Sequence, residues 1–169
     1  DARLRVIRNS VNAGFAAGSN IGLEASVGGL LVLLNNDTIV APGWLSGLAR
    51  HLDDAAVGMV GPVTNNAPNQ SRVDVDFKTY GGFLDEAARR LASPKGRDVD
   101  GLTMFCVALR RDVLQSVGLL DERYQVGMFE DNDYCARLEA VGLRLRLAED
   151  VLVHHFGEAS FGKLVATGE

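Results

Sequence analysis

An unbroken apolar run, residues 30–34, leads directly into two amides and a carboxylate, Asn35, Asn36 and Asp37. A run of this kind is typical of a strand that is buried on both faces of a mostly parallel sheet. Open α/β sheets bind their ligands at the carboxyl ends of such strands. Asp37 therefore stands where a carboxylate could contact a metal ion or a phosphate, although Asn and Asp are also common turn formers.

A second group of acidic side chains, Glu130, Asp131 and Asp133, stands at the start of an expected helix that ends at Gly142. Acidic residues favour helix N-termini through the helix dipole, so a purely structural role also explains them. A carboxylate that is ionised and faces a pocket can instead act as a general base toward a hydroxyl group.

Two adjacent histidines, His154 and His155, close the last apolar segment. On a strand they point to opposite faces, so at most one of them is expected to reach a given site. With Asp37, one histidine would form a mixed oxygen and imidazole site. Oxygen ligands suit Mg²⁺ or Mn²⁺, and an imidazole shifts the preference toward Mn²⁺. Zinc would need more thiol or histidine ligands at characteristic spacing.

The segment 12–22 contains three glycines and two asparagines, which predicts a loop with unusual backbone angles. Ser19 or Asn20 would cap a helix that runs to about Val27. A glycine-rich turn between a strand, expected over residues 4–7, and a helix can bind phosphate. The spacing nevertheless matches neither of the two common glycine motifs for phosphate binding.

The composition is that of an ordinary folded domain: of 169 residues, 47% are hydrophobic and 23% are charged, which predicts a single domain over residues 1–169. The net charge of −5 argues against nucleic-acid binding. No apolar run reaches the roughly 18 residues that span a bilayer. Cys106 and Cys135 are too few to frame a fold, so we expect reduced thiols and a cytoplasmic protein. Because the chain begins at Asp1 and not at a Met, we expect a fragment.

Apolar periodicity predicts strands and helices in alternation along the chain, which indicates an α/β protein. We expect strands over residues 4–7, 30–34, 57–62, 102–109, 143–147 and 151–153. We expect helices over residues 44–53, 83–92 and 111–117, in addition to the two described above.

Five segments of the chain stand in an order that carries a family resemblance. They are Asn12-x-Gly14-Phe15-Ala16-x-Gly18-x-Asn20-x-Gly22, Leu33-Leu34-Asn35-Asn36-Asp37-Thr38, Gly118-x-x-Asp121-Glu122, Phe129-Glu130-Asp131-x-Asp133, and a closing histidine and glycine segment. In this order they resemble a family 2 glycosyltransferase, and most of all the bacterial rhamnosyltransferase-like members that build cell-surface polysaccharide. The resemblance covers the chain from about Val6 to Phe161.

The resemblance implies the GT-A fold, a three-layer αβα sandwich around a mostly parallel mixed sheet, and a nucleotide-sugar donor bound with Mn²⁺ or Mg²⁺. It implies donor binding by Asn12, Gly14, Gly18, Asn20, Asn35, Asn36 and Asp37. It implies metal contacts from Asp37 and from His155 or, failing that, His154. Asp131 matches the catalytic base with Glu130 in support, and the acceptor side would include Asp121, Glu122 and Asp133.

This assignment predicts a single inverting displacement. A metal ion would stabilise the diphosphate leaving group, and a base would take the proton of the attacking acceptor hydroxyl. Holding donor and acceptor in line turns their encounter into an oriented step. The prediction therefore requires Asp37 and Asp131 to face one cleft.

Two features depart from the family pattern. The position of the family's Asp-x-Asp motif begins with Asn35, whose amide brings less charge to a cation than a carboxylate would. Family members also begin with a strand, a helix and a strand that bind the base and ribose. These elements would precede Leu4, so we expect that they are missing here and that an open sheet edge favours a homodimer.

Two other functions stay open. One is a nucleotidyltransferase on a related sandwich, although its glycine-rich signature with Lys or Arg is not visible near the amino end. The other is a carbohydrate-binding or scaffold remnant without catalysis. A saccharide or lipid-linked acceptor would be compatible with peripheral contact at the inner face of the membrane, but no amphipathic basic helix indicates it.

Overall fold

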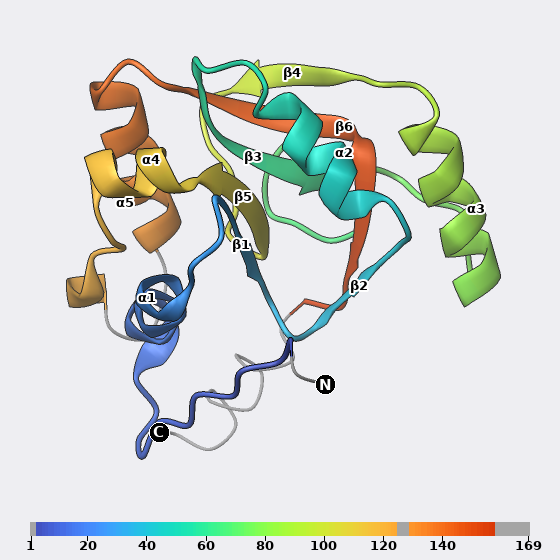
Figure 1. The fold of residues 1–169 in the computed structure, drawn as a ribbon. Helices are drawn as coiled ribbons and strands as arrows, with labels where there is room; N and C mark the ends of the chain where they lie inside the picture. The colour runs from blue at the N-terminus through green and yellow to red at the C-terminus, as the bar shows by residue number, and fades with distance from the viewer. Residues whose placement is uncertain (1–2, 125–128, 158–169) are drawn as a thin grey trace.

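The computed structural model describes residues 3–124 and 129–157, which form one mixed sheet with helices packed on both of its faces (Figure 1). In chain order the elements are α1 (Gly14–Ala25), β1 (Leu30–Leu34), β2 (Thr38–Val40), α2 (Trp44–His51), β3 (Val57–Val63), α3 (Tyr80–Leu91), β4 (Gly96–Val99), β5 (Cys106–Arg110), α4 (Arg111–Val117), the 3₁₀ helix η1 (Glu122–Tyr124), α5 (Glu130–Ala140) and β6 (Arg144–His155).

The strand order is β1-β5-β3-β6-β2, and β4 pairs with β6. β6 runs parallel to β3 and antiparallel to β4 and β2, while β5 is antiparallel to both β1 and β3. The α/β class and the mixed sheet agree with the prediction. The predicted predominance of parallel pairs is wrong for the described strands, because an apolar run reports burial on both faces and not the direction of a neighbouring strand.

Two hydrophobic clusters lie on opposite faces of the sheet, as the alternation along β5 shows. Val107 and Leu109 belong to the larger cluster, which includes buried residues of α1, α3, α4 and α5. Cys106 and Ala108 belong to the second cluster, which is covered by α2. Successive strand residues point to opposite faces, so this division confirms the predicted three layers.

Several predicted elements have different bounds in the structure. Residues 4–7 form no strand, and their apolar side chains are largely exposed. The glycine-rich segment is mostly helix, because α1 begins at Gly14, which has a φ of 77°. The two strands predicted between residues 143 and 153 are one continuous strand, β6. β2 and β4 were not predicted, because β2 has only three residues and β4 has the polar sequence Gly-Arg-Asp-Val.

Asn20 joins α1 to the segment that precedes η1. Its side chain is buried, and its carboxamide pairs with the backbone of Leu120 in both directions, at 2.9 Å each. The same amide nitrogen donates to Glu122 Oε1 at 2.9 Å. Asn20 therefore makes the two backbone hydrogen bonds to Leu120 that a paired strand would otherwise make. It lies inside α1 and not at its start, so its predicted capping role is wrong.

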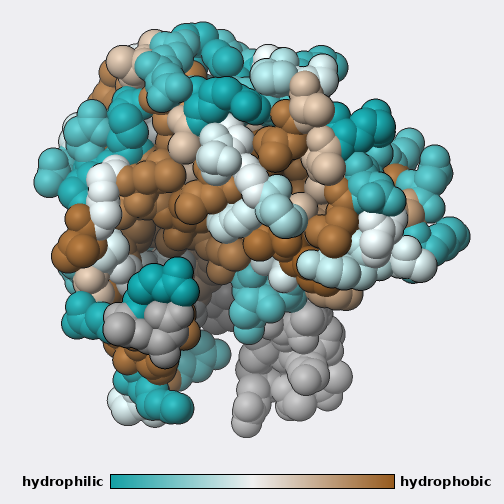
Figure 2. Space-filling model, turned by 45° about the vertical axis from the view of Figure 1, so that its right-hand side comes forward, coloured by the Kyte–Doolittle hydropathy of each residue, from teal (hydrophilic) through white to brown (hydrophobic). Residues whose placement is uncertain are grey.

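Apolar side chains also reach the surface. Figure 2 shows a broad apolar band across the face that it draws. Leu34, at the end of β1, and Leu45, in α2, are each 42% exposed. Among the described helices, none has both the length and the apolar character to cross a bilayer.

Replacing Asn20 with Ala should lower the free energy of unfolding by about 2–4 kcal/mol, because the Leu120 N–H and C=O would stay buried without partners. Urea unfolding would measure the change. Ser19→Ala, one position away on α1, is the control and should change stability by less than about 0.5 kcal/mol. Equal stability of the Asn20 and Ser19 variants would contradict this account.

Candidate active site

Asp37 and His155 lie against each other because of a strand pairing. β2 begins directly after Asp37 and pairs with the end of β6, so that Thr38 stands opposite His155. The Phe156 N–H donates to the Asp37 backbone oxygen at 2.9 Å. His155 Nε2 consequently lies 3.4 Å from Asp37 Oδ1, and the two side chains are 16% and 17% exposed. Of the two candidate histidines, the structure brings His155 to the carboxylate.

Two contacts hold the His155 ring in place. Its Nδ1 lies 2.9 Å from the backbone oxygen of Asn66, and the Phe105 ring stacks on it with centroids 4.9 Å apart and an interplanar angle of 18°. A carbonyl oxygen can only accept a hydrogen bond, so Nδ1 carries the proton. In the neutral ring, Nε2 then presents its lone pair to Asp37.

This contact fits a cation. In the described part of the chain, Asp37 Oδ1 is buried and receives no hydrogen bond. A carboxylate oxygen and a lone pair of Nε2 would repel each other at 3.4 Å unless a proton or a cation is shared between them. A carboxylate with an imidazole suits Mn²⁺. Within residues 3–124 and 129–157, no three His, Cys, Asp or Glu side chains could enclose a metal alone, so other oxygen ligands would have to complete the shell.

His154 points to the opposite face of β6. Its ring lies edge-on to three phenylalanines, Phe77, Phe83 and Phe156, at centroid distances of 5.8, 6.2 and 4.7 Å. Burial lowers the pKa of His154, and the charge of His155 lowers it further. This environment favours a neutral side chain in an aromatic cluster.

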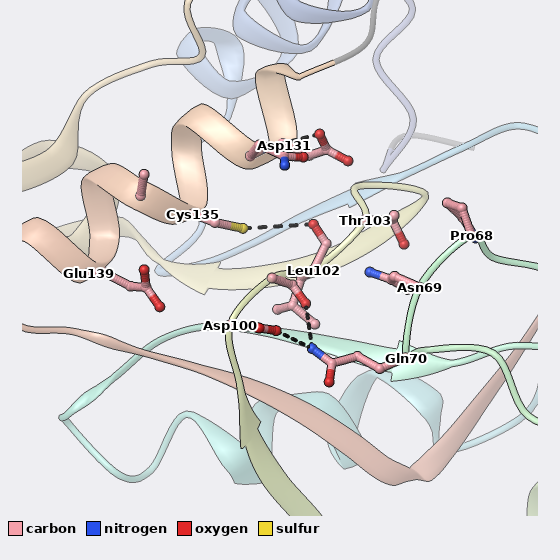
Figure 3. A pocket seen from close by; sticks show the side chains of 12 residues that line it. Pro68, Asn69, Gln70, Asp100, Leu102, Thr103, Asp131, Cys135 and Glu139 are labelled. Atoms are coloured by element: carbon pink, nitrogen blue, oxygen red, sulfur yellow. Dashed lines mark hydrogen bonds between the residues drawn. The ribbon is translucent and has the colours of Figure 1, made fainter.

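Asp131 lines a pocket of 520 Å³ between α5 and two loops, and Figure 3 shows α5 on one side with Asn69, Gln70 and Asp100 on the other. The pocket is lined by Pro68, Asn69, Gln70, Asp100, Gly101, Leu102, Thr103, Asp131, Asn132, Cys135, Ala136 and Glu139. Asp131, Cys135 and Glu139 are four positions apart on α5 and therefore share one face of the helix. The Asn132 N–H donates to Asp131 Oδ1 at 2.9 Å and orients the carboxylate.

The pocket and the Asp37–His155 pair are linked by two short chain segments. Asn66 contacts His155, and Pro68 lines the pocket two residues later. Phe105 stacks on His155, and Thr103 lines the pocket two residues earlier. Two residues of extended chain span about 7 Å at most. Neither Asp37 nor His155 lines this pocket, but two residues that line it stand two positions along the chain from residues that contact His155.

Three acidic residues predicted to bind the acceptor have other partners. Asp121 pairs with Arg123, and this hydrogen-bonded guanidinium lowers the pKa of Asp121 to about 2. Glu122 accepts from Asn20, and Asp133 accepts from Arg137 at 2.8 Å. None of the three lines the pocket. Each of these carboxylates serves a local ion pair or hydrogen bond outside the pocket, and the acceptor role stays a prediction.

Glu130, the residue before Asp131, is buried and lies on the inner side of the first turn of α5. It does not line the pocket. Its predicted supporting part in the chemistry stays a prediction, and its position in the structure is at the start of the helix that carries Asp131.

The residues predicted to bind the donor fall into two groups. Asn35 orders the turn before β2: its N–H donates to Phe105 O at 2.8 Å, and its own carbonyl accepts from Thr38 Oγ1 at 2.7 Å. Asn36 is exposed in the same turn.

The second group lies at the start of α1 and within its first two turns. The Gly14 N–H donates to Asn12 Oδ1 at 3.0 Å, and Gly18 lies within the helix with open space beside it. Leu120 and Glu122 bind the Asn20 carboxamide, and the donor contact predicted for Asn20 stays a prediction.

Several polar residues near these sites were not predicted from the sequence, among them Asn65, Asn66, Gln70, Asp100 and Glu139. Glu139 carried a signal, since it stands eight positions after Asp131 on a predicted helix. The others lie in segments that had only a loop composition, and such a composition does not say which side chains meet.

Sequence comparison relates nearly the whole chain to one family. Residues 1–167 match the sequence model described as glycosyltransferase-like family 2. The chain is 28% identical over 152 residues to the pre-mycofactocin glycosyltransferase of Mycobacterium tuberculosis, covering 90% of this chain and 32% of that protein. It is 33% identical over 153 residues to the O-antigen biosynthesis protein RfbC of Myxococcus xanthus, covering 83% of this chain and 12% of that protein. The chain thus spans a third or less of the length of these curated relatives.

Solved structures with the same fold are glycosyltransferases. GalNAc-T7, solved with UDP, GalNAc and Mn²⁺, superimposes with a TM-score of 0.66 at 19% identity over 89% of this chain and 31% of that one. The mannosyltransferase PcManGT of Pyrobaculum calidifontis, solved with GDP-Man and Mn²⁺, gives 0.62 at 17% identity over 93% and 41%. The predicted GT-A fold is confirmed. With its motifs, its fold and the match over residues 1–167, the chain belongs to glycosyltransferase-like family 2.

Proposed function

We propose that this chain carries the catalytic residues of an inverting, metal-dependent glycosyltransferase. The enzyme would move a sugar from a nucleotide-diphosphate donor to a hydroxyl group of a saccharide or lipid-linked acceptor. The observation that carries this proposal is Asp37 Oδ1, which is buried without a hydrogen bond and faces His155 Nε2 at 3.4 Å, near a pocket that Asp131 lines. Family membership supports the reaction class. The UDP, GDP-Man and Mn²⁺ of the two structural neighbours support the donor class and the metal.

Asp37 and His155 would hold the divalent cation. A bound Mn²⁺ or Mg²⁺ acts as a Lewis acid and stabilises the charge that develops on a diphosphate leaving group. The chain's own contribution is a preformed pair: Phe105 and the Asn66 carbonyl hold the imidazole, and the turn that Asn35 orders holds the carboxylate. Such preorganisation limits the reorganisation that metal binding requires.

Asp131 would take the proton of the acceptor hydroxyl as its oxygen attacks the anomeric carbon. The bond to the diphosphate breaks with its electron pair on the leaving oxygen, so one displacement inverts the anomeric centre and needs no covalent nucleophile. The pocket beside Asp131 would bind the acceptor and align it.

The side chains around this pocket suggest which acceptors it takes. Three carboxylates line it, from Asp100, Asp131 and Glu139, together with the amides of Asn69 and Gln70. Of the described residues, no Lys or Arg lines the pocket. Arg97 is not among the lining residues and donates to Gln70 Oε1 at 3.2 Å. Like charges disfavour binding, so we propose a neutral or amino-bearing saccharide end and not an anionic one.

Asp131→Asn should lower the transfer rate by about 10²–10⁴-fold, because an amide cannot accept the acceptor proton. Donor binding should stay unchanged, since Asp131 stands on the acceptor side. Nucleoside diphosphate release with a panel of nucleotide sugars and acceptors measures the rate, and calorimetry measures binding. Asp85→Asn, on the exposed side of α3, is the control and should keep the activity. Full turnover by Asp131→Asn would remove Asp131 as the base.

Chelation of divalent metals should abolish transfer, and Mn²⁺ should restore it. Asp37→Ala should weaken Mn²⁺ binding by at least about tenfold, because the site loses its one carboxylate. Electron paramagnetic resonance of free Mn²⁺ measures the affinity. Asp85→Asn on the exposed side of α3 is the control. Unchanged affinity in Asp37→Ala would place the metal elsewhere.

Acceptors that differ only in charge should be used at different rates. Wild-type protein should favour a neutral hexoside or amino sugar over the matching uronic acid. In the double variant Asp100→Asn, Glu139→Gln, the ratio of kcat/KM between the neutral or amino sugar and the uronic acid should fall by about tenfold. Asp85→Asn is again the control, and the relative kcat/KM of the paired acceptors is the measurement. A wild-type preference for the uronic acid would contradict the proposed acceptor class.

A further inference from the structure

Asn65 binds the backbone of His155 as a neighbouring strand would. Its Oδ1 accepts from the His155 N–H at 2.9 Å, and its Nδ2 donates to the His155 carbonyl at 3.0 Å. The pairing of β3 with β6 ends at Val63 and Leu152. Beyond that point, the Asn65 side chain supplies the two hydrogen bonds that the diverging backbone of residues 64–66 does not provide.

Asn66 sets the protonation pattern of the His155 ring. Its backbone oxygen accepts from Nδ1–H at 2.9 Å, and its Nδ2 donates to the Phe156 carbonyl at 3.2 Å. The opposite tautomer would place a lone pair of Nδ1 against a carbonyl oxygen. Asn66 therefore leaves Nε2 as the basic nitrogen, on the side where Asp37 Oδ1 lies at 3.4 Å.

The close approach of Asn66 depends on Gly157. This glycine has a φ of 66°, in the left-handed region, and a Cβ at this position would come within 2.1 Å of Asn66 Nδ2. An Ala here would strain the backbone after Phe156 and push the Asn66 carboxamide off the Phe156 carbonyl, which would remove one hydrogen bond that ties residue 66 to the end of β6. Gly157 thus offers a way to disturb Asn66 without changing a polar side chain.

We propose that Asn65 and Asn66 are positioning residues for the metal contact of His155. Asn65 holds the backbone of His155, and the Asn66 carbonyl selects the Nδ1–H tautomer, so that a free Nε2 faces Asp37. Partners that orient a histidine ligand in this way typically change metal affinity by about 10–100-fold when they are lost. This inference rests on the proposed function, because that proposal makes His155 a metal contact.

The test uses the 169-residue chain with four substitutions. Asn65→Ala removes both hydrogen bonds to His155, Asn65→Asp keeps the accepting oxygen, and Gly157→Ala displaces the Asn66 carboxamide from the Phe156 carbonyl. Gln115→Ala, an exposed carboxamide on α4, is the control. Circular dichroism and the thermal midpoint report folding, and the conservative Asp variant covers the case in which Asn65→Ala does not fold.

The first readout needs no metal. Imidazole ¹⁵N shifts distinguish the two tautomers, and the spectrum of His155→Ala assigns the signal among the three histidines of the chain. We expect the Nδ1–H tautomer for wild type and Gln115→Ala, and a mixture for Asn65→Ala and Gly157→Ala. The second readout is Mn²⁺ affinity in the presence of UDP. It should fall by about tenfold or more in Asn65→Ala and Gly157→Ala and by less in Asn65→Asp.

The tautomer of His155 tests the positioning role of Asn65 and Asn66, and the Mn²⁺ affinity of His155→Ala tests the proposed metal contact. A wild-type His155 with the proton on Nε2 would overturn the inference, as would an unchanged tautomer and an unchanged Mn²⁺ affinity in both Asn65→Ala and Gly157→Ala. If His155→Ala bound Mn²⁺ as well as wild type, the proposed metal contact would fail. The tautomer measurement would then still decide whether Asn65 and Asn66 orient the ring.

Discussion

The antiparallel pairing of β2 with the end of β6 is the constraint on which the candidate site depends. β6 is the strand that β3, β4 and β2 share, and its last residues reach the turn between β1 and β2 (Figure 1). Because Thr38 stands opposite His155, the carboxylate before β2 meets the imidazole at the end of β6. A shift of this register by one residue would bring His154 to Asp37 and turn His155 toward the aromatic cluster.

Two buried or half-buried asparagines extend this scaffold where regular secondary structure ends. Asn20 pairs with both backbone groups of Leu120, and Asn65 pairs with both backbone groups of His155. A carboxamide has the same donor and acceptor as a peptide group, so it can continue a hydrogen-bond ladder from a side chain. In one case it ties a helix to a loop, and in the other it holds a candidate metal ligand.

The carboxylates of helix α5 lie on different faces of the helix and have different surroundings. Asp131 and Glu139 line the pocket, whereas Asp133 pairs with Arg137 and Glu130 is buried on the inner side. The same sequence cluster therefore contains a candidate base, an ion-pair partner and a buried residue. Their roles differ because helix periodicity sends neighbours about 100° apart, and only one of those directions opens onto the cavity.

Local sequence determined the α/β class, the strand that ends at Asp37, the helix that carries Asp131 and the family itself, because apolar periodicity and motif order are properties of contiguous residues. The tertiary structure alone decided which histidine meets Asp37. It also gave Asn20, Asp121, Glu122 and Asp133 local partners outside the pocket, and it brought Asn65, Asn66, Gln70 and Asp100 to the candidate site. The physical reason is that strand register and side-chain partnership join residues far apart in the chain. Nothing in the sequence around Asn65 or His155 indicates that they meet. Only the fold shows that the Asn65 side chain bonds to the backbone of His155.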